Sequence, residues 1–150
     1  MITRLFEICI AVKDFDVAVK RYSNVLGMKP VLMKPEDVPI PGVKVAIFAI
    51  GDVTVSLLGS EREDTPIAEL VRTKGEGLAL MCLEVTDIKE TIKELKEKGV
   101  ELISDEPLPY IAGLQTYSLP ESMHGVQICW SQHSPDWDCV ESPRKLWGSS

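Results

Sequence analysis

The chain has 150 residues, of which 45% are hydrophobic and 26% are charged, and its formal net charge is -7 at pH 7. This composition is typical of a globular protein, and the acidic balance excludes a nucleic-acid partner, which needs clustered lysine and arginine. No apolar run approaches the roughly 18 residues of a membrane span, and no charged-then-apolar leader opens the chain. We therefore expect a cytoplasmic protein with no membrane partner.

A strand-then-helix pattern occurs twice along the chain. A β-branched apolar run over residues 6–12 precedes Asp14 and a helical pattern, and a similar run over 79–85 precedes Asp87 and a second helical pattern. Because the spacing is the same in both copies, it indicates an internal duplication of one structural module.

The first module combines one helix with four strands. Asp14 is the expected N-cap of the helix, and Gly27 is the residue expected to end it. Prolines make the segment between the second and third strands a loop, and Gly51-Asp52 predicts a hairpin turn. The expected elements are a strand over 4–12, a helix over 15–26, a strand over 28–33, a loop over 34–42, and strands over 43–50 and 53–58.

The second module repeats this order, and we assign both modules to one domain, 1–150. Its expected elements are a strand over 78–85, a helix over 88–98 capped by Asp87, a strand over 100–104, a loop over 106–113, and strands over 115–119 and 125–131. The domain divides into module one over 1–60, a linker helix over 64–74, module two over 77–131 and a C-terminal tail over 132–150. The tail has no periodicity, so we expect it to be extended, with its tryptophans packed or frayed, and we expect His124 and His133 on the surface.

Several short strings resemble the vicinal oxygen chelate (glyoxalase, bleomycin resistance and dioxygenase) superfamily, most closely its methylmalonyl-CoA epimerase-like branch. The strings are residues 8–14 (ICIAVKD), 38–45, 64–68, 75–77, 96–100 and 125–128. The resemblance implies an α+β fold in which two βαβββ modules form a cup-shaped, partly closed sheet with the helices outside. It also implies a homodimer.

The same resemblance implies a divalent metal held by four strand residues in the cup. Carried over position by position, these four places fall on Glu7, Ser56, Leu80 and Cys129. Leu80 has no donor atom and Ser56 is a poor ligand, whereas a catalytic site needs about three protein ligands. The resemblance also implies a second carboxylate just before the Gly-Val that opens the third strand. Here Pro41 directly precedes Gly42, so that residue is missing. We therefore predict no metal and no cofactor, and we do not expect ordinary epimerase or glyoxalase activity.

Strand alternation predicts which side chains line the cup. The candidate ligand-binding residues are Cys9, Ser56, Leu80, Cys82, Glu84, Gln115, Tyr117, Gln127 and Cys129. Glu7 is the candidate general acid or base, because a carboxylate within an apolar strand is costly unless it is paired or used. The alternative is that Glu7 reaches solvent, Lys44 or Arg4. The cysteines of this set are interpreted as small buried hydrophobic residues, with a site for a soft metal ion as the alternative.

Three functions remain open at this stage. The first is an epimerase-like protein with a degenerate metal site that binds a small organic ligand, of acyl or carboxylate type, in the cup. The second is a metal-independent isomerase or lyase that uses Glu7 as acid or base. The third is a pseudoenzyme or a subunit whose surface binds a partner protein.

Overall fold

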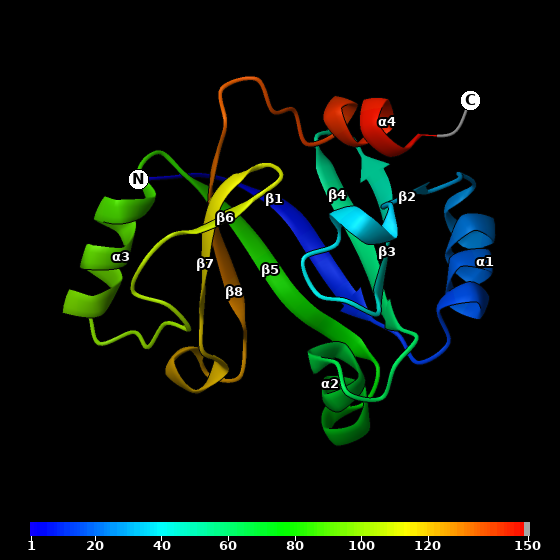
Figure 1. The fold of residues 1–150 in the computed structure, drawn as a ribbon, viewed down its shortest axis with the longest axis horizontal. Helices are drawn as coiled ribbons and strands as arrows, with labels where there is room; N and C mark the ends of the chain where they lie inside the picture. Colours follow the sequence, from blue (N-terminus) through cyan, green and yellow to red (C-terminus); the bar gives the residue numbers. More distant parts are fainter. Residues whose placement is uncertain (149–150) are drawn as a thin grey trace. The chain divides into compact units, whose positions relative to one another are not determined.

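The structure, a computed structural model, describes residues 1–148, which form eight strands, four α-helices and two short 3-10 helices (Figure 1). The strands are β1 (Ile2–Ala11), β2 (Val31–Leu32), β3 (Val43–Ile50), β4 (Val53–Ser60), β5 (Gly77–Val85), β6 (Leu108–Tyr110), β7 (Gly113–Ser118) and β8 (Ile128–His133). The α-helices are α1 (Phe15–Leu26), α2 (Pro66–Lys74), α3 (Ile88–Glu97) and α4 (Glu141–Trp147), and the 3-10 helices are η1 (Pro35–Asp37) and η2 (Pro120–Met123). The predicted α+β class is confirmed.

The chain divides into two compact units, and strands β1 and β5 each contribute residues to both. The α3 unit consists of residues 1–7 and 80–137, and its strands are hydrogen-bonded in the order β1-β5-β8-β7-β6. The α1 unit consists of residues 8–79 and the described residues from 138 onward, with the order β2-β3-β4-β1. Strands β5 and β8 pair in parallel, whereas β2–β3, β3–β4, β6–β7 and β7–β8 pair antiparallel.

The two long helices begin as the sequence predicts. The Asp14 carboxylate accepts a hydrogen bond from the Val17 backbone N–H at 3.1 Å, and the Asp87 carboxylate accepts one from the Glu90 N–H at 3.1 Å. Each aspartate thereby pairs a helix-terminal N–H that would otherwise lack a partner within the helix. Helix α1 ends at Gly27, which adopts the left-handed conformation with φ 66°. The duplicated spacing therefore gives the same start to both helices.

Each unit packs one helix against an apolar sheet face. In the α1 unit the helix covers a core of four buried residues from the strands and the turn that follows β1, and in the α3 unit the helix shares a core with the strands. These cores are Val12, Ala46, Phe48 and Leu57 in the α1 unit, and Val85, Ile88, Ile92, Ile128 and Trp130 in the α3 unit. Gly59 fits under α1 only because it lacks a side chain, since a Cβ there would lie 2.7 Å from Cβ of Phe15.

Module two departs from the sequence prediction in its middle. The strand predicted over 100–104 is wrong, because this segment contributes only an isolated bridge between Leu102 and Ser118. The loop predicted over 106–113 is also wrong in part, because it contains β6, which pairs with β7 through Leu108 and Gln115. A strand that contains a proline can occupy a sheet edge, where an N–H donor is not required, and β6 is the last strand in its order.

The tail predicted to be extended is instead structured as far as residue 148. Strand β8 continues to His133, and helix α4 follows after a turn. The Asp138 carboxylate accepts the backbone N–H groups of Val140 at 2.9 Å and Glu141 at 2.7 Å, so it pairs two N–H groups at the start of the helix. Trp147 is 8% exposed, and its indole N–H donates to the Asp37 carboxylate at 2.7 Å.

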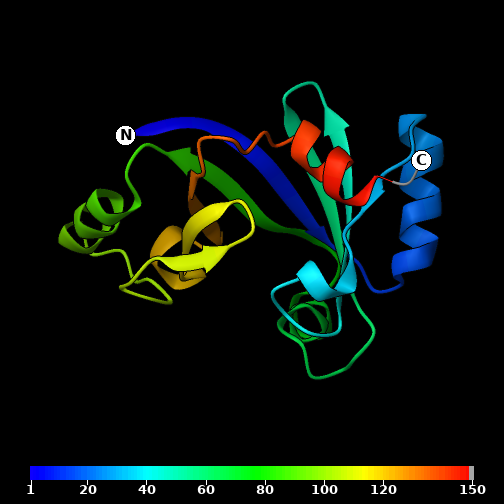
Figure 2. The ribbon, with the colours of Figure 1, turned by 45° about the horizontal axis from the view of Figure 1, so that its top comes forward.

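Helices α1 and α4 lie on opposite sides of strands β2, β3 and β4 (Figure 2). Helix α1 packs on the core face of β3 and β4, which carries Phe48 and Leu57. Helix α4 lies over the other face, beside Ile47 and Thr54. Among the described residues, no helix is long and apolar enough to cross a membrane.

Candidate functional site

One face of the sheet in the α3 unit is polar. Strand pairing puts Cys82 opposite Cys129, Cys129 opposite Tyr117, and Glu84 and Gln115 both opposite Ser131. Opposed residues share a face, and residues two apart along a strand also share it, so these side chains all project away from the α3 core. We call this set, with Glu7, the polar sheet face: Glu7, Cys82, Glu84, Gln115, Tyr117, Cys129, Ser131 and His133.

Two thiols donate hydrogen bonds on the polar sheet face. The Cys82 thiol lies 3.8 Å from a carboxylate oxygen of Glu7, and the Cys129 thiol lies 3.5 Å from the side-chain oxygen of Gln115. Cys82, Cys129 and Gln115 are 2%, 3% and 8% exposed. The structure therefore brings together two pairs of residues that the sequence selected separately.

The alternative partners considered for Glu7 have other contacts. The Lys44 ammonium pairs with Glu61 at 3.0 Å, and Arg4 Nε lies 3.6 Å from Glu84. Glu7 itself is half-buried and accepts the Cys82 hydrogen bond. Its proposed role as acid or base stays a prediction.

A carboxylate–imidazole pair lies at the end of the polar sheet face. His133 Nδ1 donates to the Glu84 carboxylate at 2.5 Å, and the Thr3 hydroxyl donates to the same carboxylate at 3.0 Å. The Phe6 ring meets the His133 ring edge-on, with centroids 4.5 Å apart. The His133 side chain is 6% exposed, so the prediction that His133 lies on the surface is wrong.

Burial and hydrogen bonding set the charge of this pair. Burial opposes ionisation of Glu84, but hydrogen bonds from His133 and Thr3 and the nearby Arg4 charge outweigh it and lower the pKa of the carboxyl. Burial also dominates at His133, and it lowers the pKa of the imidazole although Glu84 acts in the opposite direction. Near neutral pH the pair is therefore a neutral imidazole that donates to an ionised carboxylate.

The other predicted site residues are distributed between the two units. Cys9 and Ser56 belong to the α1 unit and are buried, with 3% and 0% exposure. Leu80 is a half-buried residue of β5. Gln127 was expected on the last strand but lies just before β8, where its carbonyl accepts the Met81 N–H at 3.2 Å. The cysteine cluster for a soft metal stays a prediction.

The sequence reasoning missed His133 because it ended the last strand at residue 131, two residues too early. His133 continues the alternation of Cys129 and Ser131 along β8, and that period of two was the signal that could have found it. Tyr110, whose hydroxyl is hydrogen-bonded to Ser131, was missed because β6 was read as a loop.

The comparisons with known proteins agree with the resemblance in the sequence. Residues 6–117 match the model of the Glyoxalase/Bleomycin resistance protein/Dioxygenase superfamily. A mitochondrial methylmalonyl-CoA epimerase of Bos taurus is 35% identical over 104 residues, a match that covers 69% of this chain but only 58% of that protein. An ethylmalonyl-CoA/methylmalonyl-CoA epimerase of Cereibacter sphaeroides is 36% identical over 109 residues, which cover 71% of this chain and 80% of the relative.

Solved structures give the same result. A hypothetical protein from Bacillus halodurans C-125 aligns with a TM-score of 0.77 at 33% identity, covering 89% of this chain and 96% of that one. A Streptomyces coelicolor methylmalonyl-CoA epimerase variant in complex with 2-nitronate-propionyl-CoA aligns with a TM-score of 0.77 at 26% identity, covering 90% and 97%. The chain therefore belongs to the Glyoxalase/Bleomycin resistance protein/Dioxygenase superfamily and is epimerase-like within it.

Proposed function

We propose that this chain binds a small acyl compound on the polar sheet face, without the metal that the resemblance implies. The observation that carries the proposal is the geometry of Gln115. Its side-chain oxygen is held by the Cys129 thiol, and its amide nitrogen has no hydrogen bond to any described residue. A fixed amide N–H in a largely buried setting is a donor for the carbonyl or carboxylate oxygen of a ligand.

The ligand class follows from the relatives. The bovine relative is named for methylmalonyl-CoA, and the Cereibacter relative is named for ethylmalonyl-CoA and methylmalonyl-CoA. The Streptomyces structure contains 2-nitronate-propionyl-CoA. A thioester and a carboxylic acid both present carbonyl oxygens to an amide donor. We therefore infer that the ligand is an acyl thioester or a related carboxylic acid, and that Glu7, Glu84 and Tyr117 contribute to its recognition.

The side chains at the four carried-over metal positions do not fit a hard divalent ion. Leu80 has no donor atom, and the Cys129 thiol is engaged as a donor to Gln115. Glu7 and Cys129 would offer one hard and one soft ligand, whereas a catalytic metal site uses about three protein ligands. We infer that the metal site of the family is degenerate in this chain, and no step of the proposed function involves a metal.

The test combines elemental analysis with ligand titration. Protein purified without chelator would be analysed for metals and by native mass spectrometry, and then titrated by calorimetry with methylmalonyl-CoA, propionyl-CoA, CoA and methylmalonate. We expect a metal-free protein that binds at least one acyl probe. Stoichiometric cobalt, nickel, zinc or manganese would overturn the metal-free proposal, and no binding of any probe would overturn the ligand assignment.

A matched pair of variants tests Gln115 itself. Gln115→Glu keeps the acceptor for Cys129 but removes the amide donors, so we expect acyl binding to weaken by about tenfold or more. Gln132→Glu makes the same chemical change at a residue whose side-chain oxygen accepts the Ile88 N–H at 2.8 Å, and it should leave binding unchanged. Equal affinities of both variants and the unaltered protein would refute the role of Gln115.

A second candidate function is a metal-independent isomerase or lyase. It is favoured by the half-buried Glu7 and by the neutral His133 imidazole ordered by Glu84, both of which are acid–base groups on the same sheet face. Exchange of the α-hydrogen of methylmalonyl-CoA in D2O, followed by NMR, would detect such chemistry. We expect Glu7→Gln to slow exchange by about 100-fold or more if Glu7 moves the proton. An absence of exchange in the unaltered protein would exclude this candidate for that substrate.

A partner-binding subunit, a homodimer and a cytoplasmic location stay predictions. Light scattering after size exclusion, at several protein concentrations, would determine whether the chain dimerises. Mass that stays at one chain throughout would contradict the homodimer.

A further inference from the structure

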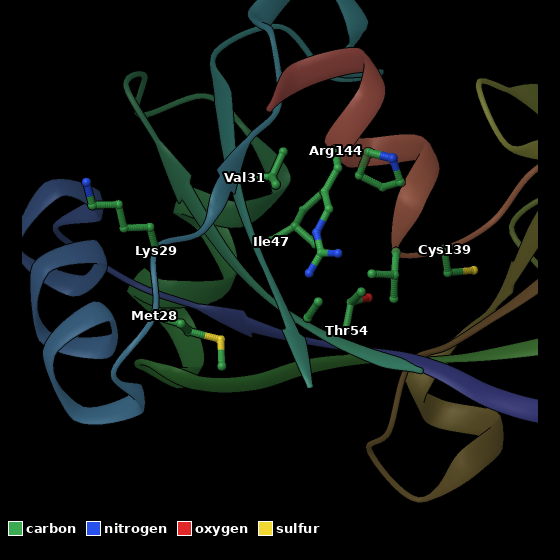
Figure 3. A pocket seen from close by; sticks show the side chains of 10 residues that line it. Met28, Lys29, Val31, Ile47, Thr54, Cys139 and Arg144 are labelled. Carbon is green, nitrogen blue, oxygen red and sulfur yellow. The ribbon is translucent and has the colours of Figure 1, made fainter. Parts of the chain in front are cut away.

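The α1 unit contains a pocket that lies outside the proposed function. It occupies about 150 Å³ between helix α4 and the sheet face that does not carry the α1 core (Figure 3). Its walls include Val31, Ile47, Ala49 and Thr54 from the strands, and Val140 and Arg144 from the C-terminal segment. The residues that form it belong to one unit, and α4 lies outside the region that matches the family model.

Strand alternation and two small residues create this space. Ile47, Ala49 and Thr54 project away from α1, because their strand neighbours Phe48 and Leu57 point into the core beneath that helix. Ala49 and Thr54 are direct partners in the β3–β4 hairpin, so two small side chains lie side by side.

Helix α4 is held over this face by a hydrogen bond at its C-terminal end, and the residue before its N-terminal end is buried. The Trp147 indole donates to Asp37 at 2.7 Å, and Cys139, just before the helix, is 7% exposed. Helix α4 therefore forms one wall of a pocket that is partly open to solvent, and the Arg144 side chain in it is 56% exposed.

Arg144 supplies a charge to the pocket. Figure 3 shows its guanidinium directed from α4 into the pocket toward Thr54, whereas the Lys29 side chain points away. One guanidinium nitrogen, Nη1, donates to the Glu141 carboxylate at 2.9 Å. A guanidinium has five N–H donors, and this contact is its only side-chain hydrogen bond to the part of the chain that the structure describes. Donors on Nε and Nη2 therefore remain for another acceptor.

We propose that this pocket binds a small monocarboxylate with a compact apolar body. An apolar cavity of about 150 Å³ accommodates a molecule as large as benzene, so the volume suits four to seven carbon atoms. The apolar body contacts Val31, Ile47 and Val140, and the carboxylate pairs with Arg144, which binds carboxylates in a bidentate geometry. Two acidic residues lie nearby. Glu141 accepts one hydrogen bond from the Arg144 guanidinium, and Asp37 accepts the hydrogen bond from the Trp147 indole.

The probes are isobutyrate and benzoate, followed by amide shifts in two-dimensional NMR spectra of the isotope-labelled chain. We expect saturable shifts at residues of α4, β3 and β4. The matched amides, isobutyramide and benzamide, should bind at least tenfold more weakly, because they lack the charge. Inorganic phosphate should cause no comparable shifts, because it lacks the apolar body. Equal binding of acid and amide, or equal binding of phosphate, would overturn the proposal.

Three variants locate the site. Arg144→Met should weaken benzoate binding by about tenfold or more, whereas Lys145→Met, the same loss of charge at the next residue of α4, should not. Ala49→Leu fills the pocket and should abolish binding while it leaves Arg144 in place, and thermal unfolding would verify that it folds. Unchanged affinity in Arg144→Met, or in a folded Ala49→Leu, would refute the pocket as the binding site.

Discussion

In both units of this molecule, one face of the sheet packs against a helix. The other face differs in chemical character between the two units. Both pack a capped helix against an apolar face, around Phe48 in the α1 unit and Trp130 in the α3 unit. On the opposite face, the α3 unit carries thiols, carboxylates and an imidazole. The α1 unit instead has a pocket beneath helix α4 that is lined mainly by apolar side chains, with Arg144 at its wall.

The difference shows how a duplicated module can acquire two roles. Because side chains alternate along a strand, the residues that hold the helix and the residues of the other face are separate sets. One set can change while the other continues to specify the fold. The comparison therefore predicts that changes to the helix-packed faces are costly in both units.

The largest effects should come from the two helix-packed cores. Phe48→Ala and Trp130→Ala should each lower the free energy of unfolding by about 3 to 5 kcal/mol, because each leaves a cavity. Phe48 is 0% exposed and Trp130 is 6% exposed. Urea unfolding would measure both, with Ile50→Ala and Ile103→Ala as controls at residues 45% and 49% exposed. If only one of the two core variants lost much stability, the helix-packed faces of the two units would not be equivalent.

The contact that holds α4 in the α1 unit should matter less. Trp147→Phe keeps most of the packing but removes the indole donor to Asp37, and we expect a loss of about 1.5 kcal/mol, the lower range for a hydrogen bond to a charged group. Thermal and urea unfolding would measure it. In the Trp147→Phe background, a further Asp37→Asn change should add little, and full additivity of the two changes would show that they do not act through this contact.

The helix caps provide a smaller and symmetrical test. Asp14→Ala and Asp87→Ala each remove the acceptor for one helix-terminal N–H, so each should cost about 1 kcal/mol. Asp136→Ala, at an exposed aspartate outside any helix, is the control. Unequal costs of the two cap variants would show that the duplicated pattern is not used equally in both copies.

The smallest effect should be a pH dependence contributed by the His133–Glu84 pair of the α3 unit. The pKa of His133 is lowered by folding, so the unfolded chain takes up this proton first as the pH falls below the ordinary value of 6.5. Stability is therefore full above that pH and declines as the pH falls toward the lowered pKa. Glu84, whose pKa is also lowered, adds a second decline below its ordinary value of 4.5.

Unfolding free energies at several pH values would test this dependence. His133→Gln should remove the first decline, between about pH 6.5 and the onset of the carboxylate titration. His124→Gln changes the other histidine, an exposed residue, and should leave the profile as it is. An unchanged profile in His133→Gln would show that burial of this imidazole does not control it.

The sequence was sufficient where local chemistry decides the structure. The caps at Asp14 and Asp87, helix α1 and the long strands follow from side-chain oxygens, periodicity and glycine, which act within a few residues. It was insufficient where distant contacts decide. Helix α4 has seven residues, too few for a stable isolated helix, and it forms because Trp147 packs on a segment 110 positions earlier.

The candidate site was predicted in the same uneven way. Alternation selected Glu7 with Cys82 and Gln115 with Cys129, although the sequence contains no information on which of these residues would be paired. The partner of Glu84 was missed because His133 was assigned to a tail, and its position depends on the pairing of β5 with β8, which are more than forty residues apart. Contacts between strands distant in sequence are the part that local patterns do not contain.

The α1 unit is built from two segments that are far apart in the sequence, and this affects the order in which its parts are synthesised. Most of this unit is synthesised by residue 79, but the helix that covers its open face begins at residue 141. At about 5 to 20 residues per second, a ribosome needs several seconds to roughly ten to add the intervening segment. Throughout that interval Val31 and Ile47 lack their α4 cover, so the growing chain exposes an apolar surface to chaperones until helix α4 leaves the ribosome.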